Sequence, residues 1–312
     1  MNAALLAAAL LVGCLLAVQA SVNLQLNKAV GTPYGASTVQ LGVAAGLLVV
    51  LAAVTGSLGA LGKLPGVEWW HLLGGLASPL YITSGILLFP RLGALASVGL
   101  FVTGQMFSSL ALDLGGLLGL EKKGLSPGVA LGALAVLAGI IVIIRGQQAT
   151  APPGAPTMSG PGRIGWIVLG IVAGGVLPVQ GAVNAELRHG LGAPITVAAF
   201  SFTVATLTIA VVLLVLRLTG RTPRPQLTPL KAMPWWGWLG GACAAGYVTG
   251  TFLLIPEIGA AVTVGLTVTG QQLTSALIDH RGMFRLPTRV LSVPRLTGLG
   301  LLLAGSLAIQ LV

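Results

Sequence analysis

Apolar runs of about twenty residues recur along the chain, separated by short segments rich in proline, glycine and basic residues. A helix needs about 20 such residues to cross a hydrocarbon core of about 30 Å. The runs lack the alternation of apolar and polar residues that a membrane β-barrel requires. The pattern therefore predicts ten transmembrane helices, near residues 3–26, 35–57, 70–89, 94–113, 127–145, 164–187, 195–217, 236–254, 260–279 and 295–312.

The second half of the chain repeats the polar and aromatic positions of the first half. Gln19 and Asn23 return as Gln180 and Asn184, at an offset of 161 residues (180 − 19). Further on the offset becomes 166 and the match is denser. The pairs include Trp69-Trp70 with Trp235-Trp236, Gly74-Gly75 with Gly240-Gly241, Tyr81 with Tyr247, Gln105 with Gln271, Ser109 with Ser275 and Asp113 with Asp279. Two copies that each hold an odd number of spans must cross the membrane in opposite directions, as in many secondary transporters.

These observations predict an all-α polytopic membrane protein, built as an inverted repeat of five plus five helices. The first copy covers residues 1–145, a Pro/Gly/Ala/Thr-rich linker covers 146–162, and the second copy covers 163–312. Proline ends helices, so we expect the loops to contain the prolines that flank the spans. These are Pro65, Pro90, Pro127, Pro223, Pro225, Pro256 and Pro294.

The composition excludes an ordinary soluble domain. Only 7% of residues are charged and 55% are hydrophobic, and the mean hydropathy is +0.98, whereas soluble domains carry about 25% charged residues. The net charge of +10 does not indicate nucleic-acid binding, because the basic residues lie in short loops between spans. Cys14 and Cys243 fall within spans and are expected to be free buried thiols.

The basic residues are distributed unevenly between the two predicted faces of the membrane. We call the face that holds both chain ends the terminal face, and the opposite face, which holds the linker, the linker face. The terminal face carries Lys63, Lys122, Lys123 and Arg188. The linker face carries Lys28, Arg91, Arg145, Arg163, Arg217, Arg221, Arg224, Lys231, Arg281, Arg285, Arg289 and Arg295. The excess of positive charge predicts a cytoplasmic linker face and both termini outside.

Repeated amides inside the spans are candidates for a substrate path. The spacing of Gln19 and Asn23, and of Gln180 and Asn184, places both side chains on one helix face. Amides donate and accept hydrogen bonds at once, which suits a neutral or zwitterionic ligand. The alternative is a purely structural role in hydrogen bonding between helices.

A second polar stripe recurs with a spacing of four residues. It consists of Gln105, Ser109 and Asp113 in the first copy and Gln271, Ser275 and Asp279 in the second. The glutamines fall about halfway along their spans, where inverted-repeat carriers bind ligands. The aspartates fall at helix ends, as candidates for coupling or gating, and both pairs would also fit structural hydrogen bonding.

Tyr81 and Tyr247 lie near the middle of their spans, where a phenol needs a partner and could contact either a substrate or a neighbouring helix. The tryptophan pairs lie where spans begin and are expected interface anchors. The sequence contains no HExxH motif, P-loop or nucleophile elbow, and its histidines lack metal-ligand spacing. We therefore expect neither an enzyme nor an ATP-driven pump, and no metal or cofactor.

The motifs resemble those of a known transporter family. LPVQGAVNAEL at 177–187, PWWGWLGG at 234–241 and Thr269-Gly270-Gln271 with Ser275 and Asp279 are similar to the YdcZ-like (DUF606) branch of the drug/metabolite transporter superfamily (EamA-like). The first copy matches less closely. The resemblance implies a fused form with ten helices that moves small organic molecules, and it implies cytoplasmic termini, in contrast to the charge distribution.

The function expected from these patterns is secondary transport of small polar or amphipathic metabolites or drugs across the bacterial inner membrane. The two copies would rock against each other around a central cavity. Two alternatives stay open: a non-transporting scaffold or accessory subunit, and a flippase for lipid-linked head groups. The expected partners are membrane lipid and a small-molecule substrate. A monomer suffices because one chain supplies both halves, and a homodimer stays open.

Overall fold

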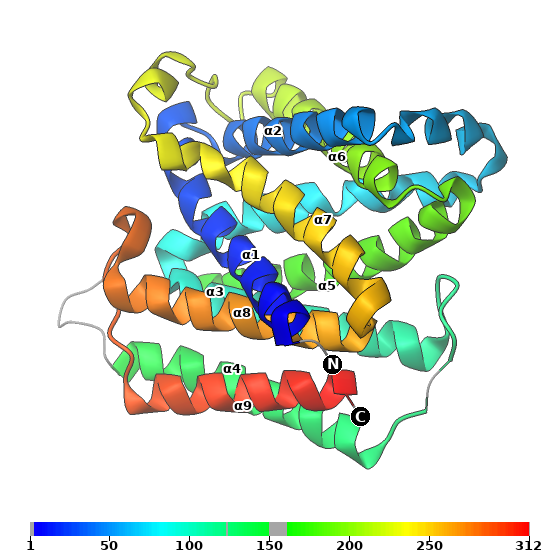
Figure 1. Cartoon of the computed structure of the whole chain (residues 1–312). Helices are drawn as coiled ribbons and strands as arrows, with labels where there is room; N and C mark the ends of the chain where they lie inside the picture. The colour runs from blue at the N-terminus through cyan, green and yellow to red at the C-terminus, as the bar shows by residue number, and fades with distance from the viewer. Residues whose placement is uncertain (1–2, 123, 150–160, 312) are drawn as a thin grey trace.

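Helices and their connecting segments make up the whole of the described structure (Figure 1). The computed structural model of the chain describes residues 3–122, 124–149 and 161–311. The α-helices are α1 (Ala3–Val30), α2 (Pro33–Val54), α3 (Ser78–Gly115), α4 (Pro127–Ala149), α5 (Pro161–Leu191), α6 (Pro194–Leu218), α7 (Leu239–Ile258), α8 (Ala260–Arg281) and α9 (Val293–Leu311). Short 3-10 helices are η1 (Ser57–Gly66), η2 (Trp69–Leu76), η3 (Thr228–Ala232), η4 (Trp235–Trp238) and η5 (Met283–Arg285).

Each of the ten predicted spans coincides with a helical segment. Seven helices are long and apolar enough to cross a membrane by length and composition, and one of them, Trp69–Gly115, contains two of the predicted spans. A shorter apolar helix, Val293–Ile309, corresponds to the last span. The remaining span is α8, whose glutamines and Asp279 lower its hydropathy although those side chains are buried. The fold confirms a polytopic all-α membrane protein.

The breaks between the third and fourth spans lie at glycines and not at the predicted prolines. Pro90 lies inside α3 and Pro256 inside α7. Each helix continues for three residues and then breaks, at Gly93 (φ 80°, ψ 169°) and Gly259 (φ 83°, ψ 155°). This combination of angles is essentially restricted to glycine. The expectation that both prolines lie in loops was wrong. A proline inside a helix leaves one carbonyl of the preceding turn without its hydrogen bond, and the helix can continue past that point with a kink.

The helices on either side of the predicted linker, residues 146–162, extend into it at both ends. α4 continues to Ala149 and α5 begins at Pro161, and residues 150–160 lie outside the described ranges. The two copies also make hydrogen bonds to each other at the linker face. The backbone N–H of Gln226 donates to the carbonyl of Val30 at 2.9 Å, and the Gln25 side chain donates to the carbonyl of Phe284 at 2.9 Å. These contacts join α1 of the first copy to two connecting segments of the second copy.

The matching helices of the two copies run antiparallel. In α4 and α9, Gly132 lies against Gly305 and Gly139 lies against Gly298, so one helix ascends as the other descends. The two helices lie side by side at one edge of the bundle in Figure 1. The same holds for α2 and α6, since the hydroxyls of Thr32 and Thr222 are 2.8 Å apart at one end. At the other end the Thr196 hydroxyl donates to the carbonyl of Ser57 at 2.8 Å. The repeat is therefore inverted.

Each copy places its first helix against the fourth helix of the other copy. α1 packs on α8 through Gly13 and Gly270, and a Cβ atom on either glycine would collide with the backbone carbonyl of Thr267 or Leu10, respectively. The matching pair joins α5 to the second half of α3. There Gly174 meets the carbonyl of Phe101 and Gly104 meets that of Ile171. Small residues let backbones approach closely in membranes, where apolar burial alone does not drive helix association.

Candidate functional site

Two asparagines of the predicted path lie at equivalent contacts between the copies. The side-chain oxygen of Asn23 lies over Gly240, and that of Asn184 lies over Gly74, so close that a Cβ atom on either glycine would collide with it. Neither oxygen has a hydrogen-bond partner among the described residues. A buried amide oxygen without a partner costs free energy, so each is available to a water or a polar ligand.

The interior of the bundle brings together three of the predicted residues, Tyr81, Tyr247 and Gln271. Gln271 Nε2 donates to the Tyr81 hydroxyl at 3.0 Å, which joins α8 to α3. The Tyr81 ring packs on Phe101 with centroids 4.7 Å apart. Tyr247 lies in the same region of the interior. Side chains from both copies therefore meet here.

The equivalent residues of the other pair do not form the hydrogen bond that joins Gln271 to Tyr81. By the repeat, Gln105 and Tyr247 correspond to Gln271 and Tyr81. Tyr247 instead lies beside Thr267, and the buried Gln105 Nε2 has no hydrogen-bond partner in the described part of the chain. The centre is thus symmetric in sequence and asymmetric in hydrogen bonding.

The other predicted path residues divide into paired and unpaired groups. The Gln180 amide exchanges hydrogen bonds with Ser78, at 2.8 Å and 3.0 Å, whereas buried Gln19 Oε1 has no partner among the described residues. The difference follows from sequence, because Ala244 stands where the repeat places the twin of Ser78. The Ser275 hydroxyl donates to its own helix, at the carbonyl of Gln272, which indicates a structural role. Ser109 is half-buried.

Gln272 is a further candidate residue that the repeat pattern missed. It is fully buried, and both of its polar side-chain atoms lack partners among the described residues. It lies seven residues before Asp279, so the two share one face of α8. Its twin is Met106, and a search for polar residues present in both copies therefore passes over it. The signal that could have found it is a glutamine next to Gln271 inside a span.

Asp279 lies where the chain of the other copy breaks. Its carboxylate accepts hydrogen bonds from the backbone N–H groups of Ala94 (2.7 Å) and Leu95 (3.2 Å), directly after the break at Gly93. It therefore caps the second half of α3, where a carboxylate also interacts favourably with the helix dipole. A 2.7 Å ion pair joins it to Arg295 Nη2, and both side chains are 1% exposed.

Arg295 corrects the prediction that it belongs to a basic loop. Its guanidinium lies inside the protein and donates to the carbonyls of Arg289 and Val290, each at 2.9 Å. Burial lowers the pKa of nearby Arg289, and the Asp279 carboxylate opposes that shift. Asp279, Arg295 and the break at Gly93 together form what we call the latch, at the linker face. The latch joins the end of α8 and the start of α9, in the second copy, to α3 of the first copy.

The matching end of the first copy differs from the latch. Asp113 is half-buried. Nothing described lies within 4 Å of a Cβ atom placed on Gly259, whereas one on Gly93 would meet Asp279 and Arg289. By the offset of 166, Val129 occupies the position in the first copy that corresponds to Arg295. The first copy thus lacks the arginine on which the latch depends.

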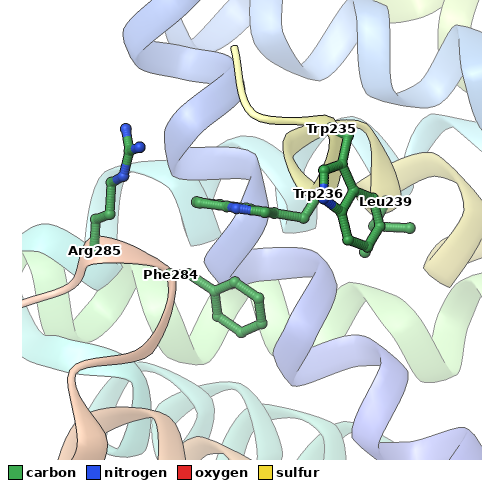
Figure 2. Close-up of a pocket in the computed structure, with 5 residues that line it drawn as sticks. All are labelled: Trp235, Trp236, Leu239, Phe284 and Arg285. Carbon is green, nitrogen blue, oxygen red and sulfur yellow. The ribbon is translucent and has the colours of Figure 1, made fainter.

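An aromatic pocket of about 400 Å³ opens near the latch, lined by Trp235, Trp236, Leu239, Phe284 and Arg285 (Figure 2). Trp236 and Phe284 have ring centroids 5.6 Å apart, and the Arg285 guanidinium lies 5.9 Å from the Trp236 ring. The indoles were predicted as interface anchors, and Trp235 is 75% exposed. Trp236 instead forms a wall of this pocket.

The backbone of this pocket is strained at two neighbouring residues. Phe284 (φ 57°) and Arg285 (φ 59°) adopt the left-handed conformation, as do their twins Leu118 (φ 55°) and Gly119 (φ 79°). Glycine adopts it without steric cost, whereas an arginine does not. The second copy therefore has Arg285 at a position where the first copy has Gly119, the residue that suits this conformation.

The described residues contain no group of three or more His, Cys, Asp or Glu side chains that could hold a metal ion. Both cysteines are free. What the interior offers is a set of amides and phenols contributed by both copies.

Comparison with known proteins identifies the family. No curated protein matches the chain in sequence. A solved structure described only as "Crystal structure of protein" superposes with a TM-score of 0.60 at 16% identity, covering 97% of this chain and 96% of that one, which supports the fold alone. A family model described as "Putative inner membrane exporter, YdcZ" matches residues 4–142 and again residues 165–308. The chain, with both halves matched in turn, belongs to the YdcZ family of inner membrane transport proteins.

Proposed function

We propose that the protein exports small polar or amphipathic molecules by alternating access between its two inverted copies. The observation that carries the proposal is the unequal hydrogen bonding of matching residues at the centre. Tyr81 and Gln271 are joined by a hydrogen bond, whereas Nε2 of Gln105, the repeat equivalent of Gln271, has no partner among the described residues. Inverted repeats can exchange conformations, so that each copy adopts the arrangement of the other. In the alternate state Gln105 would bond to Tyr247 and Gln271 would be released.

The latch supports the same mechanism. It closes the linker face by joining the two copies, while the matching glycine at the terminal face has open space beside it. With a cytoplasmic linker face and both termini outside, this arrangement corresponds to a state closed toward the cytoplasm. Gln19, Asn23, Gln105 and Asn184 would then present unpaired polar atoms to a neutral or zwitterionic substrate.

The latch also favours gating over proton coupling for Asp279. Its carboxylate is already bound by two backbone N–H groups and by Arg295, and it lies at the end of a span, so it joins the two copies at the linker face and is not placed in the middle of the membrane. We therefore expect efflux from substrate-loaded proteoliposomes to continue after a protonophore collapses the proton gradient. Transport that stops on adding the protonophore to sealed vesicles would contradict this assignment.

A binding and transport assay tests the proposal directly. Thermal shift of the purified chain against a panel of neutral and zwitterionic amphiphiles detects binding by mass action, and the hits are then loaded into proteoliposomes for efflux. The double variant Gln105→Leu/Gln271→Leu should lose binding and efflux. Gln226→Leu, a matched change at an exposed loop glutamine, should keep both. A double variant that still transports at the wild-type rate would sink the proposal, and a protein that neither binds nor transports any of the panel would favour a scaffold.

A further inference from the structure

A large apolar groove lies outside the central path, between α3, α4 and α5. Its volume is about 750 Å³. Leu100 and Thr103 of α3 form its floor, and isoleucines and leucines of α4 and α5 form its walls. The wall residues Leu137, Ile141 and Ile164 are exposed at the outside of the bundle. The groove therefore opens toward the lipid of the membrane.

Two arginines from different helices meet at one end of the groove. Arg145 comes from α4 and Arg163 from the first turn of α5, both at the linker face. Arg163 leans across to α4, where Nη2 lies 3.5 Å from the carbonyl oxygen of Ile144. A third arginine, Arg91, stacks on the Trp166 ring of α5 at 4.2 Å. Basic groups thus concentrate where the apolar groove ends.

The protein provides no carboxylate to balance this charge. Its six acidic residues are Glu68, Asp113, Glu121, Glu186, Glu257 and Asp279. The first five belong to the terminal face by the order of the helices, and Asp279 is buried in the latch with Arg295. Arg163 also lies at the start of a helix, where the dipole is positive and favours an anion. The site has strong electrostatic complementarity to an external anion.

The dimensions of the groove correspond to one membrane leaflet. It extends along α5 from Arg163 to Ile171, which is about 12 Å at about 1.5 Å per residue. Half of a hydrocarbon core is about 15 Å. An occupant with an anionic group at the arginines and hydrocarbon along the isoleucines would fill the groove.

We infer that this groove binds an anionic phospholipid of the leaflet at the linker face, with its phosphate between Arg145 and Arg163. The sequence restricts the site to one copy. The positions that match these arginines by the repeat are Leu311 and Asn2, so the twin surface lacks both charges. The lipid would contact α3, α4 and α5 together, beside the junction of the two copies.

Thermal shift of the full-length protein in detergent tests the inference, with dioleoyl phosphatidylglycerol and dioleoyl phosphatidylcholine as probes. The wild-type protein should be stabilised more by phosphatidylglycerol. Arg145→Gln/Arg163→Gln should weaken the apparent affinity for it on the order of thirtyfold, since each basic residue beside an anionic lipid contributes about fivefold. Native mass spectrometry should show one fewer retained lipid.

Matched variants separate a built site from general attraction to a basic face. Arg221→Gln/Arg224→Gln removes the same charge from the linker face outside the groove and should retain the preference for phosphatidylglycerol. Ile167→Trp fills the groove without changing charge and should lose it. Equal losses in both arginine pairs, or an Ile167→Trp variant with wild-type lipid affinity, would overturn the inference. An equal shift with glycerol 3-phosphate alone would also overturn it, because a head group without acyl chains would then suffice.

Discussion

The two copies share a fold and differ where each meets its own face of the membrane. At the linker face the second copy provides Asp279 and Arg295 and caps the break at Gly93. At the terminal face the matching Gly259 has open space beside it, and Val129 occupies the position that corresponds to Arg295. The comparison indicates that backbone packing sets the common architecture, whereas a few polar side chains determine which end is closed.

The largest expected effect concerns the two aspartates. Asp279→Asn leaves Arg295 buried beside a neutral partner and should cost about 3–5 kcal/mol of stability. Asp113→Asn, at a half-buried position where solvent screens the charge, should cost less than about 1 kcal/mol. Thermal unfolding in detergent measures both. Adding Arg295→Met to Asp279→Asn should recover part of the loss, and equal losses in the two single variants would contradict the asymmetry.

The next effect tests the symmetry of the packing. Gly104→Ala and Gly270→Ala each place a methyl group against a backbone carbonyl of the opposing helix, and each should cost about 1–3 kcal/mol. The two losses should be similar because the contacts are equivalent. Gly46→Ala and Gly300→Ala have no described atom within 4 Å of the new Cβ and serve as controls. A loss confined to one copy would show that the helices do not pack crosswise in both.

The smallest effect has the opposite sign. Arg285→Gly gives the second copy the residue of the first and relieves a left-handed conformation that costs an L-residue about 1–2 kcal/mol. We expect a gain of about 1 kcal/mol, because some cation–π attraction to Trp236 is lost. The reverse exchange, Gly119→Arg, should destabilise, since Gly119 has a φ of 79° and this left-handed conformation costs an L-residue about 1–2 kcal/mol. Melting temperatures that fall in both variants would exclude strain at Arg285.

Much of this architecture was predictable from the sequence because the repeat carries it. Spans of the right length and an odd number per copy were enough to predict the inverted fold, and the antiparallel contacts of α4 with α9 confirm it. The tyrosines and glutamines were predicted to line one region, and Tyr81 with Gln271 joins both copies there. Whether these residues bind substrate stays a prediction.

The remaining features depend on how the helices meet, which single positions do not reveal. Pro90 and Pro256 indicated helix ends, yet the breaks fall at glycines three residues later, because glycine alone tolerates the required angles. Arg295 looked like a loop cation until the fold placed it beside Asp279. Gln272 has no polar twin, so the rule that found the other amides could not find it.

The contact between Glu186 and Gly119 has a consequence for how such a protein can change. If two identical, unlinked subunits assembled head to tail, a mutation would appear on both surfaces of the bilayer at once. An arginine acquired beside the aromatic pocket would then also appear at the position of Gly119 on the far side, next to Glu186. Covalent fusion removes this constraint, so one surface can become cationic and aromatic while the other keeps its glycine. The two copies can then differ enough for the protein to favour one conformation in the absence of substrate.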